Sequence, residues 1–236
     1  MGANAVTLPS PTRHTRTALT GRAGVIVNYR TGETVVLTGD TLTRWLASLE
    51  HSSAPAPVAI RESKVSWGTN ETAARLESVS PPPWAWRMAA AAALLTTLAA
   101  REVGRPGKRF GRLRRLAETG RDLPAATTAH ARLALLSVRW VARVFPARVA
   151  CLEESTAASL LLALGGRGSA WRHGVATDPI RLHAWICDIH GRPVEEPEHT
   201  GDYTPINEPT DLKRDPHARP AHPAARQARQ PGHDQP

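Results

Sequence analysis

Hydrophobic residues in the first part of the chain follow the patterns of a β-hairpin and a helix. Two runs rich in β-branched residues, 25–30 and 34–37, flank a turn that contains Gly32, and this arrangement predicts a hairpin. Residues 41–49 then predict a short amphipathic helix that is capped by Asp40. The apolar side of this helix consists of Leu42, Trp45, Leu46 and Leu49.

Three later segments have the composition or periodicity of helices. Residues 84–100 are rich in Ala and Leu, but they form a short run that contains Arg87, so they predict a buried helix rather than a membrane span. Their apolarity leaves membrane association open. Residues 110–116 predict a helix with a basic face, and residues 129–144 predict a helix that Pro146 ends. The apolar stripe of the last helix consists of Leu133, Leu136, Val138, Trp140, Val141 and Val144.

Cys151 lies where a loop becomes an apolar helix, which ends at a Gly-Gly pair. Unpaired backbone N–H groups and the positive end of the helix dipole stabilise a thiolate at such a position. The same N–H groups can donate hydrogen bonds to an oxyanion during acyl transfer. The charges of Glu153 and Glu154 in the first turn partly oppose thiolate formation. The alternative is that Cys151 is a buried, inert cysteine.

Two strands are predicted after this helix, at 169–175 and 182–187, with a turn at Asp178 and Pro179 between them. The second strand carries His183. A helix that begins with cysteine, followed by strands with a histidine, is the layout of papain-like and transglutaminase-like peptidases. The predicted fold class is therefore α+β, with such a core preceded by helices and by the small hairpin-helix unit.

Two adjacent carboxylates, Glu195 and Glu196, follow a turn at residues 190–193. If the segment is extended, their side chains point to opposite faces, so only one of them can face His183. That carboxylate would fix the tautomer of the histidine and stabilise the imidazolium of an ion pair with the Cys151 thiolate.

Other titratable or aromatic residues nearby have less specific roles. Cys187 and Trp185 share a strand face with the histidine, and we expect the cysteine to pack and the tryptophan to fill the core. Asp188, His173 and His190 lie near turns, and we expect them to be solvated. A metal site is not favoured, because the remaining histidines are scattered through irregular sequence: His199, His217, His222 and His233.

Composition suggests that less of the 236-residue chain is folded than its length allows. Residues 1–20 and 212–236 have the composition of disordered segments. Between them we expect a hairpin-helix unit at 21–80 and, at 81–211, a helical segment with the peptidase domain. Two cysteines make no disulfide framework, and the first 21 residues hold no secretion signal, so we expect a reduced, cytoplasmic chain.

The net charge of +9 raises the question of nucleic-acid binding. The charge comes largely from Arg-rich stretches at 108–115 and after residue 213, and no nucleic-acid motif accompanies them. Only two Tyr and two Phe are present to stack on bases. We therefore expect no nucleic-acid partner, and we attribute the charge to solubility or to affinity for an acidic peptide or a membrane surface.

Several short motifs in one order carry a resemblance to a known family. They are ACLEES at 150–155, WRHGV at 171–175, DP at 178–179, LHAW at 182–185, GRPV at 191–194, EP at 196–197 and YTPI at 203–206. Together they resemble the lasso peptide biosynthesis B proteins, which are transglutaminase-like enzymes. The resemblance is strong over residues 130–207 and weaker over residues 24–67.

The resemblance implies that Cys151 is the nucleophile, His183 the base and Glu196 the acid. Many members of the family have Asp at the acid position, so Glu is a departure. One extra residue before Gly191 leaves Glu195 as the alternative. The N-terminal hairpin and helix also resemble the start of winged-helix modules that bind leader peptides, and a simple packing appendage is the alternative there.

The function implied by the resemblance is that of a cysteine peptidase that removes the leader from a lasso precursor peptide. This chemistry needs no cofactor. The implied partners are the precursor, a leader-recognition protein and an ATP-dependent lasso cyclase. Two alternatives stay open, namely an acyl transferase that uses the same three residues, and a basic protein that binds peptide or nucleic acid without catalysis.

Overall fold

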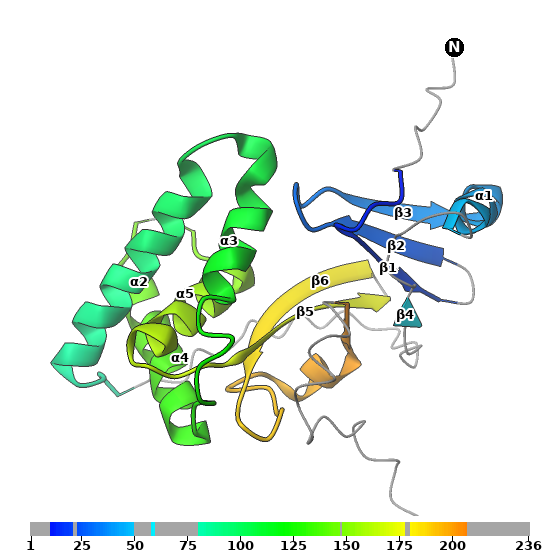
Figure 1. Ribbon diagram of the computed structural model, residues 1–236. Helices are drawn as coiled ribbons and strands as arrows, with labels where there is room; N and C mark the ends of the chain where they lie inside the picture. The colour runs from blue at the N-terminus through cyan, green and yellow to red at the C-terminus, as the bar shows by residue number, and fades with distance from the viewer. Residues whose placement is uncertain are drawn as a thin grey trace, which may run out of the picture.

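The computed structural model of the protein describes residues 10–20, 23–49, 58–59, 80–146, 148–177 and 180–206. Over these ranges the chain forms a group of helices, a central sheet and an N-terminal sheet (Figure 1). The predicted turn at Asp178 and Pro179 and the predicted tail at 212–236 lie outside the described residues.

The N-terminal sheet has the strand order β3-β2-β1-β4. Its strands are β1 Thr15–Leu19, β2 Ala23–Asn28, β3 Thr34–Thr38 and β4 Val58–Ala59. β2 and β3 form the predicted hairpin, and β1 pairs antiparallel with β2. The helix α1, Gly39–Leu49, packs on this sheet through the buried Trp45.

Two details of this unit differ from the prediction. Residues 10–20 were expected to be disordered, but β1 lies among them and its Thr15, Thr17 and Ala18 are buried. Threonine is a good strand former, but it is also polar, so the short run of β1 had the composition of a disordered segment. Asp40 does not cap α1, because the helix already begins at Gly39 and Asp40 lies in its first turn.

Four helices form the helical part of the molecule, and α5 is central to them. They are α2 Trp84–Glu102, α3 Arg109–Ala117, α4 Thr128–Ala142 and α5 Cys151–Leu164, with a short 3₁₀ turn, η1 Pro106–Lys108, before α3. α2, α3 and α4 each pack against α5. The shared core contains six fully buried alanines, Ala90, Ala93, Ala131, Ala134, Ala157 and Ala158. Such small side chains allow helix backbones to approach closely.

The prediction of a buried helix at 84–100 holds for one side of α2 only. Ala90, Ala93 and Leu94 on that side are fully buried, whereas Trp84 and Met88 on the other side are 71% and 64% exposed. No helix in the described part of the chain is long and apolar enough to cross a membrane.

The central sheet has the strand order β6-β5-β7 and packs against α5. Its strands are β5 Ala170–Thr177, β6 Ile180–Cys187 and β7 Thr204–Pro205, with a 3₁₀ helix, η2 Glu198–Asp202, before β7. In the β5–β6 register Gly174 lies opposite His183. A Cβ atom at residue 174 would lie 2.7 Å from the Trp185 ring and 2.9 Å from the Thr204 carbonyl oxygen, so only glycine leaves room for that ring.

His173 joins the two sheets. It was expected to be solvated, but it is 4% exposed, and its Nδ1 lies 3.0 Å from the Tyr29 hydroxyl in a hydrogen bond. The rings of Phe110 and Trp171 also contact it. Burial, and then the charge of His183, lowers the pKa of His173 to about 4. The expectation was wrong because the residue that covers His173 comes from a distant part of the chain.

The neutral state of His173 makes stability depend on pH. Because its pKa falls from 6.5 to about 4 on folding, the unfolded chain binds a proton more readily in this interval. The stabilisation is complete above pH 6.5 and decreases toward pH 4, by up to about 1.4 kcal/mol per pH unit. When the pH is lowered from about 7.5 to about 5, the free energy of unfolding measured in urea should therefore fall by about 2 kcal/mol more for the wild type than for His173→Gln. Equal losses in the two proteins would contradict this assignment.

Candidate active site

Cys151 is the first residue of α5 and is partly exposed. The residue before it, Ala150, has no side-chain acceptor, so it does not cap the helix in the usual way. Instead, Glu153 reaches back, and its Oε2 accepts a hydrogen bond from the Ala150 N–H at 3.1 Å. The thiol therefore lies at the positive end of a buried helix whose start is held by its own first turn.

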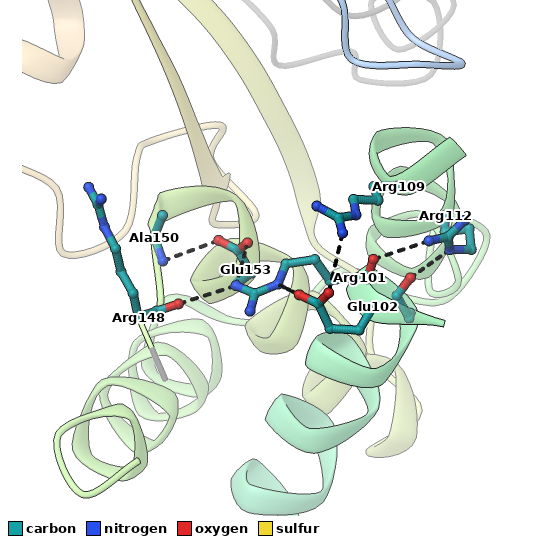
Figure 2. A network of polar contacts seen from close by, with 8 residues as sticks. Arg101, Glu102, Arg109, Arg112, Arg148, Ala150 and Glu153 are labelled. Atoms are coloured by element: carbon teal, nitrogen blue, oxygen red, sulfur yellow. Dashed lines mark hydrogen bonds and ion pairs between the residues drawn. The ribbon is translucent and has the colours of Figure 1, made fainter. Parts of the chain in front are cut away.

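The start of α5 is also anchored to the end of α2 (Figure 2). Arg101 donates to Glu153 Oε1 at 3.2 Å and to the Arg148 carbonyl at 3.2 Å, and it pairs with Glu102 at 2.7 Å. The first-turn carboxylate that was expected to oppose a thiolate is thus balanced by an arginine.

His183 lies on β6 between the candidate nucleophile and an acid. Its Nε2 is 2.7 Å from Glu196 Oε2, and a side-chain hydrogen bond also links it to Cys151. Burial lowers the pKa of His183, but the hydrogen bonds to Cys151 and Glu196 outweigh it and raise the pKa to about 9. His183 is therefore an imidazolium at neutral pH, and it faces a thiol on one side and a carboxylate on the other.

The structure brings Glu196, and not Glu195, to the histidine. The Glu196 side chain is 6% exposed, and its Oε2 also accepts a hydrogen bond from Thr200 Oγ1 at 3.3 Å. Glu195 instead pairs with the exposed Arg132 at 2.8 Å. The assumption of extended backbone was wrong, because Glu195 has a φ of 50° and the chain turns sharply there.

Two aromatic rings cover His183. Trp185 stacks on the imidazole, with ring centroids 5.7 Å apart, and Tyr203 approaches at 5.2 Å. Trp185 is 4% exposed, so it fills the core as expected and also shields the histidine. Burial raises the pKa of Tyr203; Arg181 opposes this, and the nearby Cys151 adds to it.

The remaining candidates lie apart from the reactive groups. Cys187 is buried, as expected for a packing residue, and burial raises its pKa to about 11. Asp188 was expected to be solvated but is 6% exposed, and it accepts hydrogen bonds from Thr128 Oγ1 and from the N–H groups of His190 and Arg192. Burial raises its pKa, but these hydrogen bonds outweigh the effect, and the pKa is lowered. Asp188 thus holds the turn that leads back to Glu196.

Two residues of the site had no signal in the sequence. Thr200 contacts Glu196 from η2, and Arg139 contacts it from α4 at 3.3 Å. Arginine is frequent in this chain, and nothing local distinguishes residue 139 from the others. Within the described ranges, no group of three or more His, Cys, Asp or Glu residues is arranged to hold a metal ion.

A thiol, an imidazolium and a carboxylate in this order can perform acyl transfer. The thiolate attacks a carbonyl carbon, the imidazolium protonates the leaving group, and a thioester forms. The thioester can then react with water or with an amine.

Comparison with families of known proteins matches residues 83–208 to the transglutaminase-like superfamily. The matched region runs from the start of α2 through β7 and contains Cys151, His183 and Glu196. The N-terminal sheet lies outside it. Comparisons with curated proteins and with solved structures give no match.

The two cysteines should differ in reactivity. At neutral pH, iodoacetamide should alkylate Cys151, beside an imidazolium, at least about ten times faster than Cys187, which is buried and has a pKa of about 11. Peptide mass spectrometry of partly alkylated protein measures both rates. In His183→Gln the rate at Cys151 should fall at least about ten-fold. Equal labelling of the two cysteines in folded protein would contradict this reading of the site.

Proposed function

The chain belongs to the transglutaminase-like superfamily, and on this premise we propose that it is a cysteine peptidase that removes the leader from a lasso precursor peptide. The superfamily includes cysteine peptidases and acyltransferases. The observation that carries the proposal is the contact of His183 with both Cys151 and Glu196. The motifs shared with lasso peptide B proteins support the choice of substrate.

In the proposed first step, the Cys151 thiolate attacks the carbonyl carbon at the junction of leader and core. Backbone N–H groups at the start of α5 donate to the oxyanion. As the C–N bond breaks, the His183 imidazolium gives its proton to the departing amine, which becomes the N-terminus of the core. The leader remains on the enzyme as a thioester.

In the second step water resolves the thioester. Neutral His183 takes a proton from the attacking water, the C–S bond breaks, and the leader leaves with a new carboxyl group. The thiolate and the imidazolium are then restored together. Glu196 holds the imidazole in both steps and stabilises its charged form.

The proposal includes partners. The released core would pass to an ATP-dependent cyclase, and a separate leader-recognition protein would present the precursor. The reaction would take place in the cytoplasm. The peptidase chemistry itself calls for no cofactor.

The first test is the mass of the products. The precursor peptide, incubated with this protein and a leader-recognition protein, should yield leader and core whose masses together exceed that of the precursor by one water. Cys151→Ala should yield neither. A leader joined to an added amine would indicate an acyl transferase, and an intact precursor with the cyclase and ATP also present would indicate a protein that binds without catalysis.

The second test separates the two carboxylates. Glu196→Ala should lower kcat at least about ten-fold, whereas Glu195→Ala, at a side chain paired with Arg132, should stay within about two-fold of the wild type.

The pH dependence of cleavage gives an independent test of which glutamate, Glu195 or Glu196, contacts His183. Because the pKa of His183 is raised to about 9, its imidazolium is present below that pH and is lost above it, so wild-type cleavage should decline above about pH 9. In Glu196→Ala this decline should begin at lower pH, since one source of the raised pKa is gone. A profile unchanged in Glu196→Ala but shifted in Glu195→Ala would reverse the assignment.

A further inference from the structure

One arginine connects the elements that carry the nucleophile and the acid. Arg139 extends from α4, and three of its nitrogens reach three acceptors. Nε donates to Glu154 Oε1 at 2.8 Å, Nη1 to the Glu195 carbonyl at 2.8 Å, and Nη2 to Glu196 Oε1 at 3.3 Å. Glu154 lies in the first turn of α5, close after Cys151. Arg139 thus joins the helix of the nucleophile to the loop of the acid.

The backbone of the acid loop depends on this contact. Glu195 has a φ of 50°, in the left-handed region that residues with a side chain rarely adopt. In this conformation its carbonyl accepts from Arg139, while the next side chain, Glu196, reaches His183. The hydrogen bond at the carbonyl therefore supports the turn that selects one carboxylate over the other.

The two oxygens of Glu196 have different partners. Oε2 accepts from His183 and Thr200, and Oε1 accepts from Arg139. His183 exchanges a proton during the proposed reaction, whereas an arginine guanidinium keeps its charge. Arg139 therefore supplies the permanent positive charge that balances a carboxylate whose side chain is 6% exposed.

Besides Arg139, three titratable groups from the elements packed around Glu196 influence it or are influenced by it. They are Glu154 from α5, His183 from β6 and Tyr203 after η2. Burial raises the pKa of Glu154, and Arg139 opposes this. Glu154 and Glu196 thus share the guanidinium of Arg139. Without Arg139, the cation that contacts Glu196 in the described part of the chain would be His183.

We propose that Arg139 is a positioning residue of this site, which holds Glu196 within reach of His183 and fixes the acid loop to the helix of Cys151. The inference rests on the proposed Cys-His-Glu chemistry, but it does not depend on which peptide is cleaved.

Arg132 offers a matched control. It lies on the same helix two turns earlier, but its side chain is 61% exposed, and its Nε pairs with Glu195 Oε1 at 2.8 Å rather than with Glu196. We would compare Arg139→Met, Arg139→Lys and Arg132→Met with the wild type. Circular dichroism would establish that each variant is folded.

The primary readout is the pH dependence of Cys151 alkylation by iodoacetamide, which needs no substrate. In Arg139→Met the rate at neutral pH should fall at least about ten-fold, and the assistance from the His183 imidazolium should end at lower pH, because Glu196, one source of the raised pKa of His183, is no longer held in place. Arg139→Lys should restore the pH dependence but only part of the rate, because an ammonium cannot donate to all three acceptors in the same geometry. Arg132→Met should match the wild type.

Cleavage of the precursor gives the second readout. Arg139→Met should lower kcat at least about ten-fold and leave KM within about two-fold, since Arg139 acts on the catalytic groups and not on peptide binding. A folded Arg139→Met with the wild-type alkylation profile would overturn the inference. If Arg139→Met does not fold, Arg139→Lys decides, and a full rate in that variant would overturn it.

The two proposals fail separately. If the wild type shows imidazolium-dependent alkylation that Arg139→Met loses, but no cleavage of the precursor, the role of Arg139 stands and the leader peptidase function falls. If the precursor is cleaved equally well by the wild type and Arg139→Met, the function stands and the role of Arg139 falls.

Discussion

The ion pair of Glu196 and His183, with 2.7 Å between the two atoms, is the interaction on which the site depends. A buried carboxylate is costly unless it is paired and hydrogen-bonded. This requirement explains why β6, η2 and α4 all send a side chain to one residue: His183, Thr200 and Arg139. Because these partners come from separate parts of the chain, the acid side of the site requires α4, β6 and η2 to be packed together.

Cys151, the proposed nucleophile, is held in a different way. Cys151 begins a helix that is buried against three others, and the two carboxylates of its first turn are each paired with an arginine from another helix. Charges that would destabilise a thiolate are thereby converted into anchors for the start of α5. A packed helix thus carries the proposed nucleophile, while a loop under backbone strain carries the proposed acid.

The sequence predicted the parts of this arrangement that depend on local pattern. The helix that starts at Cys151 and the strand that carries His183 both follow from their apolar residues and from the glycine and proline residues near their ends. The choice between the adjacent glutamates depended on the backbone conformation at Glu195, which periodicity does not report. The burial of His173 and the contacts of Arg139 depend on residues far away in the chain, so no local signal predicts them.

Gly174 has a consequence for how this fold can evolve. It faces His183 across the sheet, and the space that a methyl group would need is taken by the Trp185 ring that shields the histidine. Even alanine would displace that ring, so no series of small substitutions leads away from this glycine. A homologue with a side chain at position 174 would therefore need both a smaller residue in place of Trp185 and a shifted backbone at Thr204, and it would have to shield the imidazole of His183 by other means.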